Sequence, residues 1–154
     1  MKSIIAIAAL SVATLGFVTQ ADAFKLSPAS TKFVASGPTT LSQGTSTLHC
    51  TSTFKGKTTA TGKGKITGFS AVGDPGCSLI TATLPWTAKA TSATNIKFSN
   101  VAVAITALGI SCGPGTVNAT DNASGQVTFN ATLNPGGCMV SGTVQSMPAI
   151  TIVP

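Results

Sequence analysis

The chain of 154 residues contains no glutamate, arginine or tyrosine, and its acidic residues are three aspartates. Hydrolysis and group transfer usually need a base, an acid or a metal, and paired carboxylates are hard to assemble from so few acids. The one histidine, His49, precedes Cys50 in an alternating segment, which places its ring on the solvent side without an evident partner. We therefore expect no catalytic residue, no metal site and no cofactor, and we expect that the protein is not an enzyme.

The sequence also lacks the amphipathic 3.6-residue periodicity of helices. Thr and Val instead recur at every second position, and Gly, Pro and Asn interrupt them, which is typical of strands joined by turns. We predict an all-β domain of about ten short strands. Such spacing fits either a β-sandwich or a closed β-barrel, and we favour a single sandwich of the Ig-like or jelly-roll-like kind.

The strands are predicted from alternating apolar residues, and the turns from clusters of Gly, Pro, Asn and Asp. For example, Leu48, Cys50 and Phe54 fall on one face of the segment 48–54. The predicted strands are a loosely defined leading strand within 24–43, followed by 48–54, 60–66, 78–82, 84–90, 95–99, 101–105, 115–120, 125–133, 138–144 and 149–153. The turns are predicted at 73–76, 113–115, 121–122 and 134–137.

The first 23 residues have the three parts of a secretory signal peptide. Lys2 supplies a positive charge, Ile4 to Val18 is an almost unbroken apolar run, and Ala21-Asp22-Ala23 offers small residues at the positions that a signal peptidase reads. The run is too short for a membrane-spanning helix, and no second run of spanning length follows. We predict a helical signal peptide at 1–23, a mature domain at 24–154 without a transmembrane segment, and a secreted protein, with the cell surface or the periplasm as alternatives.

Four cysteines remain in the mature chain: Cys50, Cys77, Cys112 and Cys138. An even number in an exported chain indicates two disulfides, whereas a four-cysteine metal site lacks the CxxC spacing that it would need. Three connectivities are open, and the sequence does not choose among them. Sequential pairing, Cys50 with Cys77 and Cys112 with Cys138, is favoured because each bridge then closes a modest loop.

Four lysines, Lys55, Lys57, Lys63 and Lys65, flank the segment 58–62. If a hairpin turns at residue 60, Lys57 faces Lys63 and Lys55 faces Lys65 on the solvent side. Such a face could bind an anionic polysaccharide, lipid headgroups or nucleic acid; the alternative is a solvated strand whose lysines block edge-to-edge pairing. No aromatic residues accompany the lysines for base stacking, so we expect no specific nucleic-acid partner.

Trp86 is the single tryptophan and follows Leu84-Pro85. Its expected role is the large anchor of a core otherwise made of Val and Ala. A hydrophobic ligand site around Trp86 and Phe98 is the alternative interpretation.

Several short motifs together resemble a family of small exported bacterial proteins. They are Leu84-Pro85-Trp86-Thr87-Ala88, with Cys77 upstream and Cys112-Gly113-Pro114 downstream, and the ending Gly137-Cys138-Met139-Val140-Ser141-Gly142-Thr143 followed by Pro148-Ala149-Ile150. The resemblance runs from about Leu48 to the C terminus and is to the protein activators of alkane oxidation of the PraA/PraB type. It implies an extracellular, non-catalytic protein that promotes growth on alkanes by dispersing or contacting the hydrocarbon.

Three functions follow as hypotheses. The first is a secreted bacterial protein that promotes alkane utilisation by emulsifying or adhesive action at the hydrocarbon–water interface or on cell-surface components. The second is a self-assembling subunit of an extracellular fibre or biofilm matrix, joined through low-charge strands around Phe33 and Ile150. The third is a module that binds anionic polysaccharide or lipid through the lysine-rich hairpin.

Overall fold

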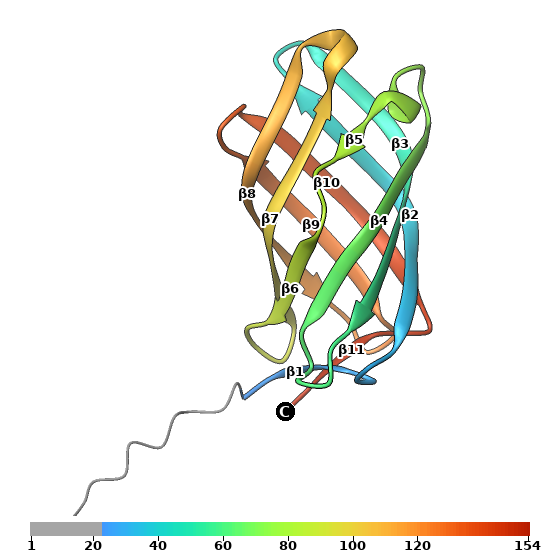
Figure 1. Ribbon diagram of the computed structural model, residues 1–154, viewed down its shortest axis with the longest axis vertical. Coiled ribbons are helices and arrows are strands. Elements are labelled where there is room, and N and C mark those ends of the chain that lie inside the picture. The colour runs from blue at the N-terminus through green and yellow to red at the C-terminus, as the bar shows by residue number, and fades with distance from the viewer. Residues whose placement is uncertain (1–22) are drawn as a thin grey trace, which may run out of the picture.

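Backbone pairing closes the strands into a barrel in the computed structural model, which describes residues 23–154 (Figure 1). The predicted signal peptide, 1–23, lies outside these residues except for Ala23. Within them, the helical segments are two 3₁₀ turns, η1 (Cys77–Leu79) and η2 (Thr106–Leu108), and neither could cross a membrane. The strands are β1 (Lys25–Ser27), β2 (Lys32–Gln43), β3 (Ser46–Thr58), β4 (Gly64–Gly73), β5 (Thr81–Ala82), β6 (Trp86–Ala90), β7 (Asn95–Ile105), β8 (Ile110–Asp121), β9 (Gln126–Leu133), β10 (Cys138–Met147) and β11 (Thr151–Val153).

The barrel is an antiparallel sheet in which both edges of β7 are bonded. The order around it is β7-β6-β4-β3-β2-β10-β9-β8, and the last strand, β8, pairs with the first, β7, which closes the barrel. Strand β6 pairs with residues 96–99 of β7, and β5 pairs farther along the same edge, with Val103 and Ala104. The strands β5 and β6 therefore share one position in the barrel.

The all-β prediction is confirmed, but the preferred sandwich is not, because the β7–β8 ladder closes the sheet. Sandwiches and barrels both bury one face of each strand, so alternation alone does not separate them. The length of the strands is what differs from expectation: β2 has 12 residues and β3 has 13. A sheet of such long, twisted strands curls until its edges meet.

Some predicted breaks lie inside longer strands. The segments 95–99 and 101–105 form the single strand β7, with a bulge at Asn100, whose φ is +62°. The predicted turn at 113–115 is an irregularity within β8, where Gly113 has a φ of +84°. Turns and bulges use the same backbone conformations, so glycine and proline signals do not distinguish them. The turns predicted at 73–76, 121–122 and 134–137 do lie where strands end.

A two-stranded sheet of β1 and β11 covers one end of the barrel (Figure 1). Leu26 of β1 and Ile150 before β11 are buried beneath it. The backbone N–H of Leu26 donates to the carbonyl of Gly62 at 2.8 Å, and the fully buried hydroxyl of Thr58 donates to the carbonyl of Pro28 at 2.6 Å. We call this the lysine end, for the lysines described below. The β2–β3, β7–β8 and β9–β10 turns lie at the opposite end.

Two disulfides, Cys50–Cys77 and Cys112–Cys138, lie toward that opposite end, which we call the disulfide end. This is the sequential connectivity, and it indicates an oxidising compartment outside the cytoplasm. Each bridge lies near a position where the strand ladder is short. The β8–β9 ladder covers only residues 119–121 and 127–129, and Cys112–Cys138 joins β8 to β10 beyond it. The β4–β6 ladder covers only residues 64–66 and 86–88, so the rest of β4 is paired with β3 alone. Cys50–Cys77 ties η1 to β3 beside this part of β4.

Replacing Cys112 and Cys138 together by Ser is expected to lower the free energy of unfolding by about 3 kcal/mol, because the bridge restricts a loop in the unfolded chain. The matched variant, Cys50→Ser with Cys77→Ser, removes the bridge that closes a loop of nearly equal length, since the two pairs are 27 and 26 residues apart in the sequence. Urea unfolding followed by tryptophan fluorescence measures both losses. Unchanged stability in either variant would contradict this role for its bridge.

Candidate functional site: the barrel interior and the charged surface

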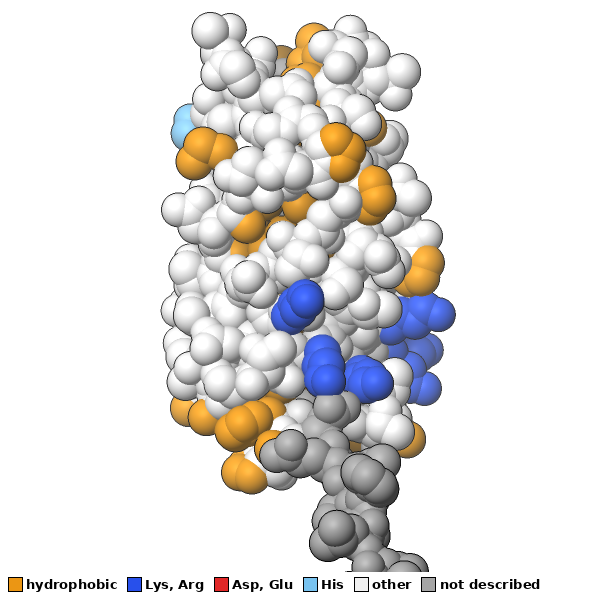
Figure 2. Space-filling model, turned by 90° about the vertical axis from the view of Figure 1, so that its left-hand side faces the viewer, with side chains coloured by type: hydrophobic (Ala, Val, Ile, Leu, Met, Phe, Trp, Pro, Cys, Tyr) orange, Lys and Arg blue, Asp and Glu red, His pale blue; other side chains and the backbone are white. Residues whose placement is uncertain are grey.

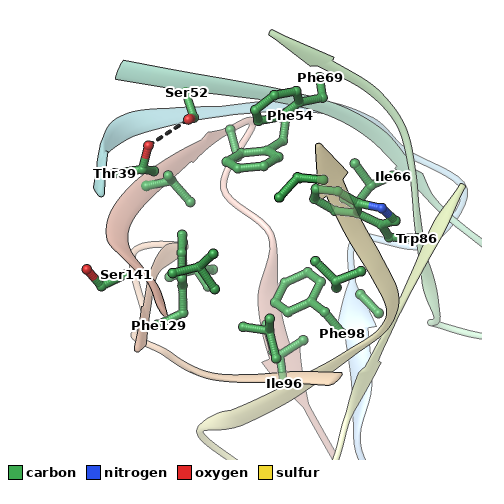
Figure 3. Close-up of a pocket in the computed structure, with 18 of the residues that line it drawn as sticks. Thr39, Ser52, Phe54, Ile66, Phe69, Trp86, Ile96, Phe98, Phe129 and Ser141 are labelled. Carbon is green, nitrogen blue, oxygen red and sulfur yellow. Dashed lines mark hydrogen bonds between the residues drawn. The ribbon is translucent and has the colours of Figure 1, made fainter. Parts of the chain in front are cut away.

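The barrel encloses an apolar cavity of about 140 Å³. Figure 3 shows the rings of Phe54, Phe98 and Phe129 around its central space, with Ile66 and Trp86 on one side. These five side chains come from β3, β7, β9, β4 and β6, so strands from around the whole barrel form the wall. The cavity lies between the two ends of the barrel and belongs to no single loop.

Small interior side chains explain why the space is not filled. Ala35, Ser52, Ala88 and Val117 all line the cavity, each at a position where a larger residue would reach toward the barrel axis. A barrel of eight strands is just wide enough to be filled by side chains or to hold one small ligand. With these small residues, the interior is not filled by side chains and has room for one small ligand.

Three aromatic rings form one part of the wall. The ring centroids of Phe54 and Phe69 are 5.4 Å apart, and Trp86 lies 6.0 Å from the first and 6.1 Å from the second. The indole N–H of Trp86 donates to the carbonyl of Thr83 at 2.8 Å. Its polar group is therefore satisfied while the ring, 5% exposed, borders the cavity. Phe98, which sequence reasoning paired with Trp86 as an alternative ligand site, lines the same cavity.

The hydroxyl groups that border the cavity are largely satisfied by neighbouring protein atoms. The hydroxyls of Thr39 and Ser52 are 2.6 Å apart (Figure 3). The hydroxyl of Ser146 donates to the carbonyl of Gly125 and accepts from the backbone N–H of Ile150. Among the described residues, none of those that line the cavity carries a charge. The site is thus suited to a neutral, apolar guest.

A second hollow lies on the outer surface, over the irregularities of β7 and β8, and has a volume of about 460 Å³. Asn100, Gly113 and Pro114 are among the residues that line it. It is larger than the interior cavity, but its lining is much more polar. The interior is the stronger candidate, because ligand sites are lined predominantly by apolar and aromatic side chains.

The lysines occupy only one half of the barrel. Figure 2 shows this arrangement for the face turned toward the viewer. In the described residues all the lysine side chains are exposed, and each lies toward the end covered by β1 and β11. They are Lys25, Lys32, Lys55, Lys57, Lys63, Lys65, Lys89 and Lys97.

The predicted register of the lysine hairpin is wrong. The turn occupies residues 59–63, so Lys57 pairs with Lys65 instead of Lys63, and a bulge places Lys55 opposite Gly68. On its other side, Lys57 lies opposite Lys32 of β2. Lys32, Lys57 and Lys65 therefore form a lysine row across three adjacent strands. Lys32 was missed because it is distant in the sequence and only the β2–β3 register brings it there.

His49 is exposed, as its place in the alternation predicts. Its Nδ1 lies 3.4 Å from the hydroxyl of Thr40, and its backbone N–H, not its ring, donates to the carboxylate of Asp74 at 2.8 Å. Among residues 23–154, no group of three or more His, Cys, Asp or Glu side chains could hold a metal ion. The geometry of these groups offers no support for metal-dependent or triad chemistry.

The whole chain, residues 1–154, matches the family described as alkane oxidation protein activator PraA/PraB-like. The protein belongs to this family. The resemblance inferred from short motifs is therefore confirmed, and the match extends over the N-terminal part as well. The comparisons with curated proteins and with solved structures gave no match.

For this member of the PraA/PraB-like family, sequence reasoning offered a hydrophobic ligand site around Trp86 and Phe98 only as an alternative, and it did not predict a cavity inside a closed barrel. Trp86 and Phe98 were visible as large apolar residues, but nothing in the sequence shows that the sheet closes. A further signal was available in the small residues: Ala35, Ser52 and Ala88 share the inward faces of their strands with the large side chains of Phe33, Phe54 and Trp86. Such residues indicate a cavity only once closure of the barrel is known.

Asp121, at the end of β8, links the barrel to its cover. The backbone N–H groups of Ile152 in β11 and of Asn122 donate to its carboxyl group. The residue is 8% exposed, and its Oδ1 is buried without a hydrogen-bond partner in the described part of the chain. Burial raises the pKa of Asp121 from 3.8 to about 6, although the two backbone hydrogen bonds act in the opposite direction.

Because this pKa is raised in the folded protein, the protonated carboxyl stabilises the fold. The stabilisation is complete below the unfolded pKa of 3.8 and is lost as the pH rises through about 6. Asp121→Asn keeps an acceptor for Ile152 but cannot ionise. We expect it to raise the free energy of unfolding at about pH 7.5, by up to about 3 kcal/mol, and to change it little near pH 4. Urea unfolding across this range is the measurement, and a gain independent of pH would contradict the assignment.

Proposed function

We propose that the protein is a secreted, non-catalytic accessory protein that promotes alkane utilisation by adsorbing at the hydrocarbon–water interface. Membership of a family described as activators of alkane oxidation supports the role in alkane utilisation. The two disulfides support a place outside the cytoplasm. The observation that carries the interfacial part is the unequal distribution of charge along the barrel.

In the part of the chain that the structure describes, the disulfide end has no lysine, and it exposes large apolar side chains. Val72 is 63% exposed, Leu79 50%, Leu108 55% and Met139 55%. The lysine end also exposes Val34, Met147 and Val153, but Val34 lies directly opposite Lys55 in the strand ladder, close to charged groups. Ammonium groups stay in water, because moving them into an apolar phase is costly. The disulfide end can therefore enter oil without taking an ammonium group with it. The charged group that lies toward this end is the carboxylate of Asp74, which is half-buried and accepts the backbone N–H of His49.

Adsorption to a hexadecane–water interface should depend on the apolar residues of the disulfide end. Leu108→Lys with Met139→Lys is expected to lower the adsorption constant about tenfold, since two half-exposed apolar side chains no longer leave water. Pendant-drop tensiometry at equal protein concentration measures this constant.

The matched control adds the same two charges at the lysine end, through Val34→Lys with Met147→Lys, and should leave adsorption nearly unchanged. Equal effects of the two double variants would show that net charge, and not the apolar end, governs adsorption. In cells, deletion of the gene should slow growth on hexadecane but not on glucose, and only the control variant should restore growth. A wild-type protein without surface activity would overturn the proposal.

A second candidate function is binding of an anionic polymer through the lysine row, Lys32, Lys57 and Lys65. Its support is geometric, since three like charges on neighbouring strands repel one another and an anion would relieve that repulsion. Lys57→Glu with Lys65→Glu is expected to abolish salt-sensitive retention on immobilised dextran sulfate. Lys89→Glu with Lys97→Glu, which changes the net charge equally on β6 and β7, should reduce retention far less. Equal losses would indicate non-specific charge attraction.

A fibre role would need a free strand edge. Strand β2, which carries Phe33, is paired with β3 on one side and β10 on the other. The strands β1 and β11 pair only with each other in the described part of the chain. Assembly by strand addition would therefore have to use the outer edges of this small sheet or the unpaired edges of β4 and β5 that face each other. No observation favours such assembly over the interfacial role.

A further inference from the structure

We propose that the interior of the barrel is a binding site for a neutral linear alkane, or for one alkyl segment of a longer one. The choice of an alkane among apolar ligands rests on the proposed function. The existence of a site rests on the cavity itself.

The size of the cavity suits a hydrocarbon of about six carbons. Its volume of about 140 Å³ is close to that of an engineered protein cavity of about 150 Å³ that stays dry and binds benzene. The wall is made of aliphatic and aromatic side chains, which give water few partners. Water inside would therefore be poorly held, and an apolar chain would replace it or fill an empty space.

The chemistry of the wall selects a neutral ligand over a fatty acid. No lysine, histidine or aspartate borders the cavity in the described part of the chain. The hydroxyls of Thr39, Ser52 and Ser146 are already hydrogen-bonded to other protein groups. A carboxylate placed here would lose its hydration without gaining a hydrogen-bond partner. An alkane makes no hydrogen bonds to water, so it loses none on entering the cavity.

A seam between β4 and β5 connects this site to the surface. Strand β4 pairs with β6 only through residues 64–66, and no ladder joins residues 67–73 of β4 to β5 in the described structure. Phe69 of β4 and Ile80, just before β5, are half-buried at this seam and also line the cavity. Val72 and Leu79 lie on the same two segments and are exposed. An alkyl chain thus passes from the apolar surface to the interior without breaking a strand ladder.

Trp86 provides a direct reporter for the test. It is the single tryptophan, the chain has no tyrosine, and its ring borders the cavity. Titration of the full mature protein with 1-bromohexane, whose bromine quenches tryptophan fluorescence on contact, is expected to give saturable quenching. Excess n-hexane should reverse it by competition. Hexanoate at neutral pH should compete at least about tenfold more weakly, because its charge is not compensated inside.

Two variants reduce the cavity, and each has a control on the outer face of the same strand. Val117→Phe fills space from β8, and Thr116→Phe places the same ring on the exposed side. Ala35→Leu fills space from β2, and Val34→Leu is its outward counterpart. Each inward variant is expected to weaken 1-bromohexane binding about tenfold, the loss of roughly two buried methylene groups. The outward variants should bind as the wild type does. If one inward variant fails to fold, as judged by circular dichroism, the other decides.

Quenching that does not saturate, or that n-hexane does not reverse, would overturn the site. So would quenching that is equal in the folded inward and outward variants.

The Leu108→Lys, Met139→Lys protein separates this inference from the interfacial role, because its cavity is unchanged and it should bind 1-bromohexane normally. Loss of adsorption with normal binding supports both proposals. Normal adsorption of the cavity variants shows that the two properties are independent, and absent binding in an adsorbing wild type refutes the interior site alone.

Discussion

The architecture depends on the pairing of β7 along both of its edges. The ladder with β8 turns an open sheet into a closed one, which removes the two free edges that a sandwich would have to protect. Closure also determines the interior, because eight strand positions set a radius that the side chains must then fill. Where inward residues are Ala, Ser and Val, they do not fill it, and the cavity follows from the closure and from these small residues together.

Two short ladders, β4–β6 and β8–β9, each of three residue pairs, leave parts of the barrel without backbone bonds toward the disulfide end. The disulfides lie beside these parts, so covalent bonds act where hydrogen bonds are few. One of the two places, between β4 and β5, combines half-buried Phe69 and Ile80 with exposed Val72 and Leu79. The route that we propose for an alkyl chain to reach the interior therefore lies beside a disulfide, at a place where backbone pairing is absent.

Much of the fold could be predicted from the sequence because period-two patterning is a local property. The burial of Trp86 in β6 and the exposure of His49 agree with this pattern. The closure of the sheet, the Lys57–Lys65 register and the position of Lys32 could not be predicted, because each depends on pairing between distant segments. Gly113-Pro114 was read as a turn although it lies within β8, because local signals do not distinguish a turn from a bulge. Predicting the cavity would have required both the local alternation of side chains and the pairing between distant segments.

Confinement of the lysines to one half has a consequence for orientation. It gives the molecule a permanent electric dipole along the barrel axis, since no lysine of residues 23–154 lies in the opposite half, where Asp74 adds a negative charge. The field of a negatively charged cell envelope would turn this dipole so that β1 and β11 point toward the cell. A layer of such molecules would present its lysine-free, apolar ends outward, and a hydrophilic cell would acquire a coat that oil can wet.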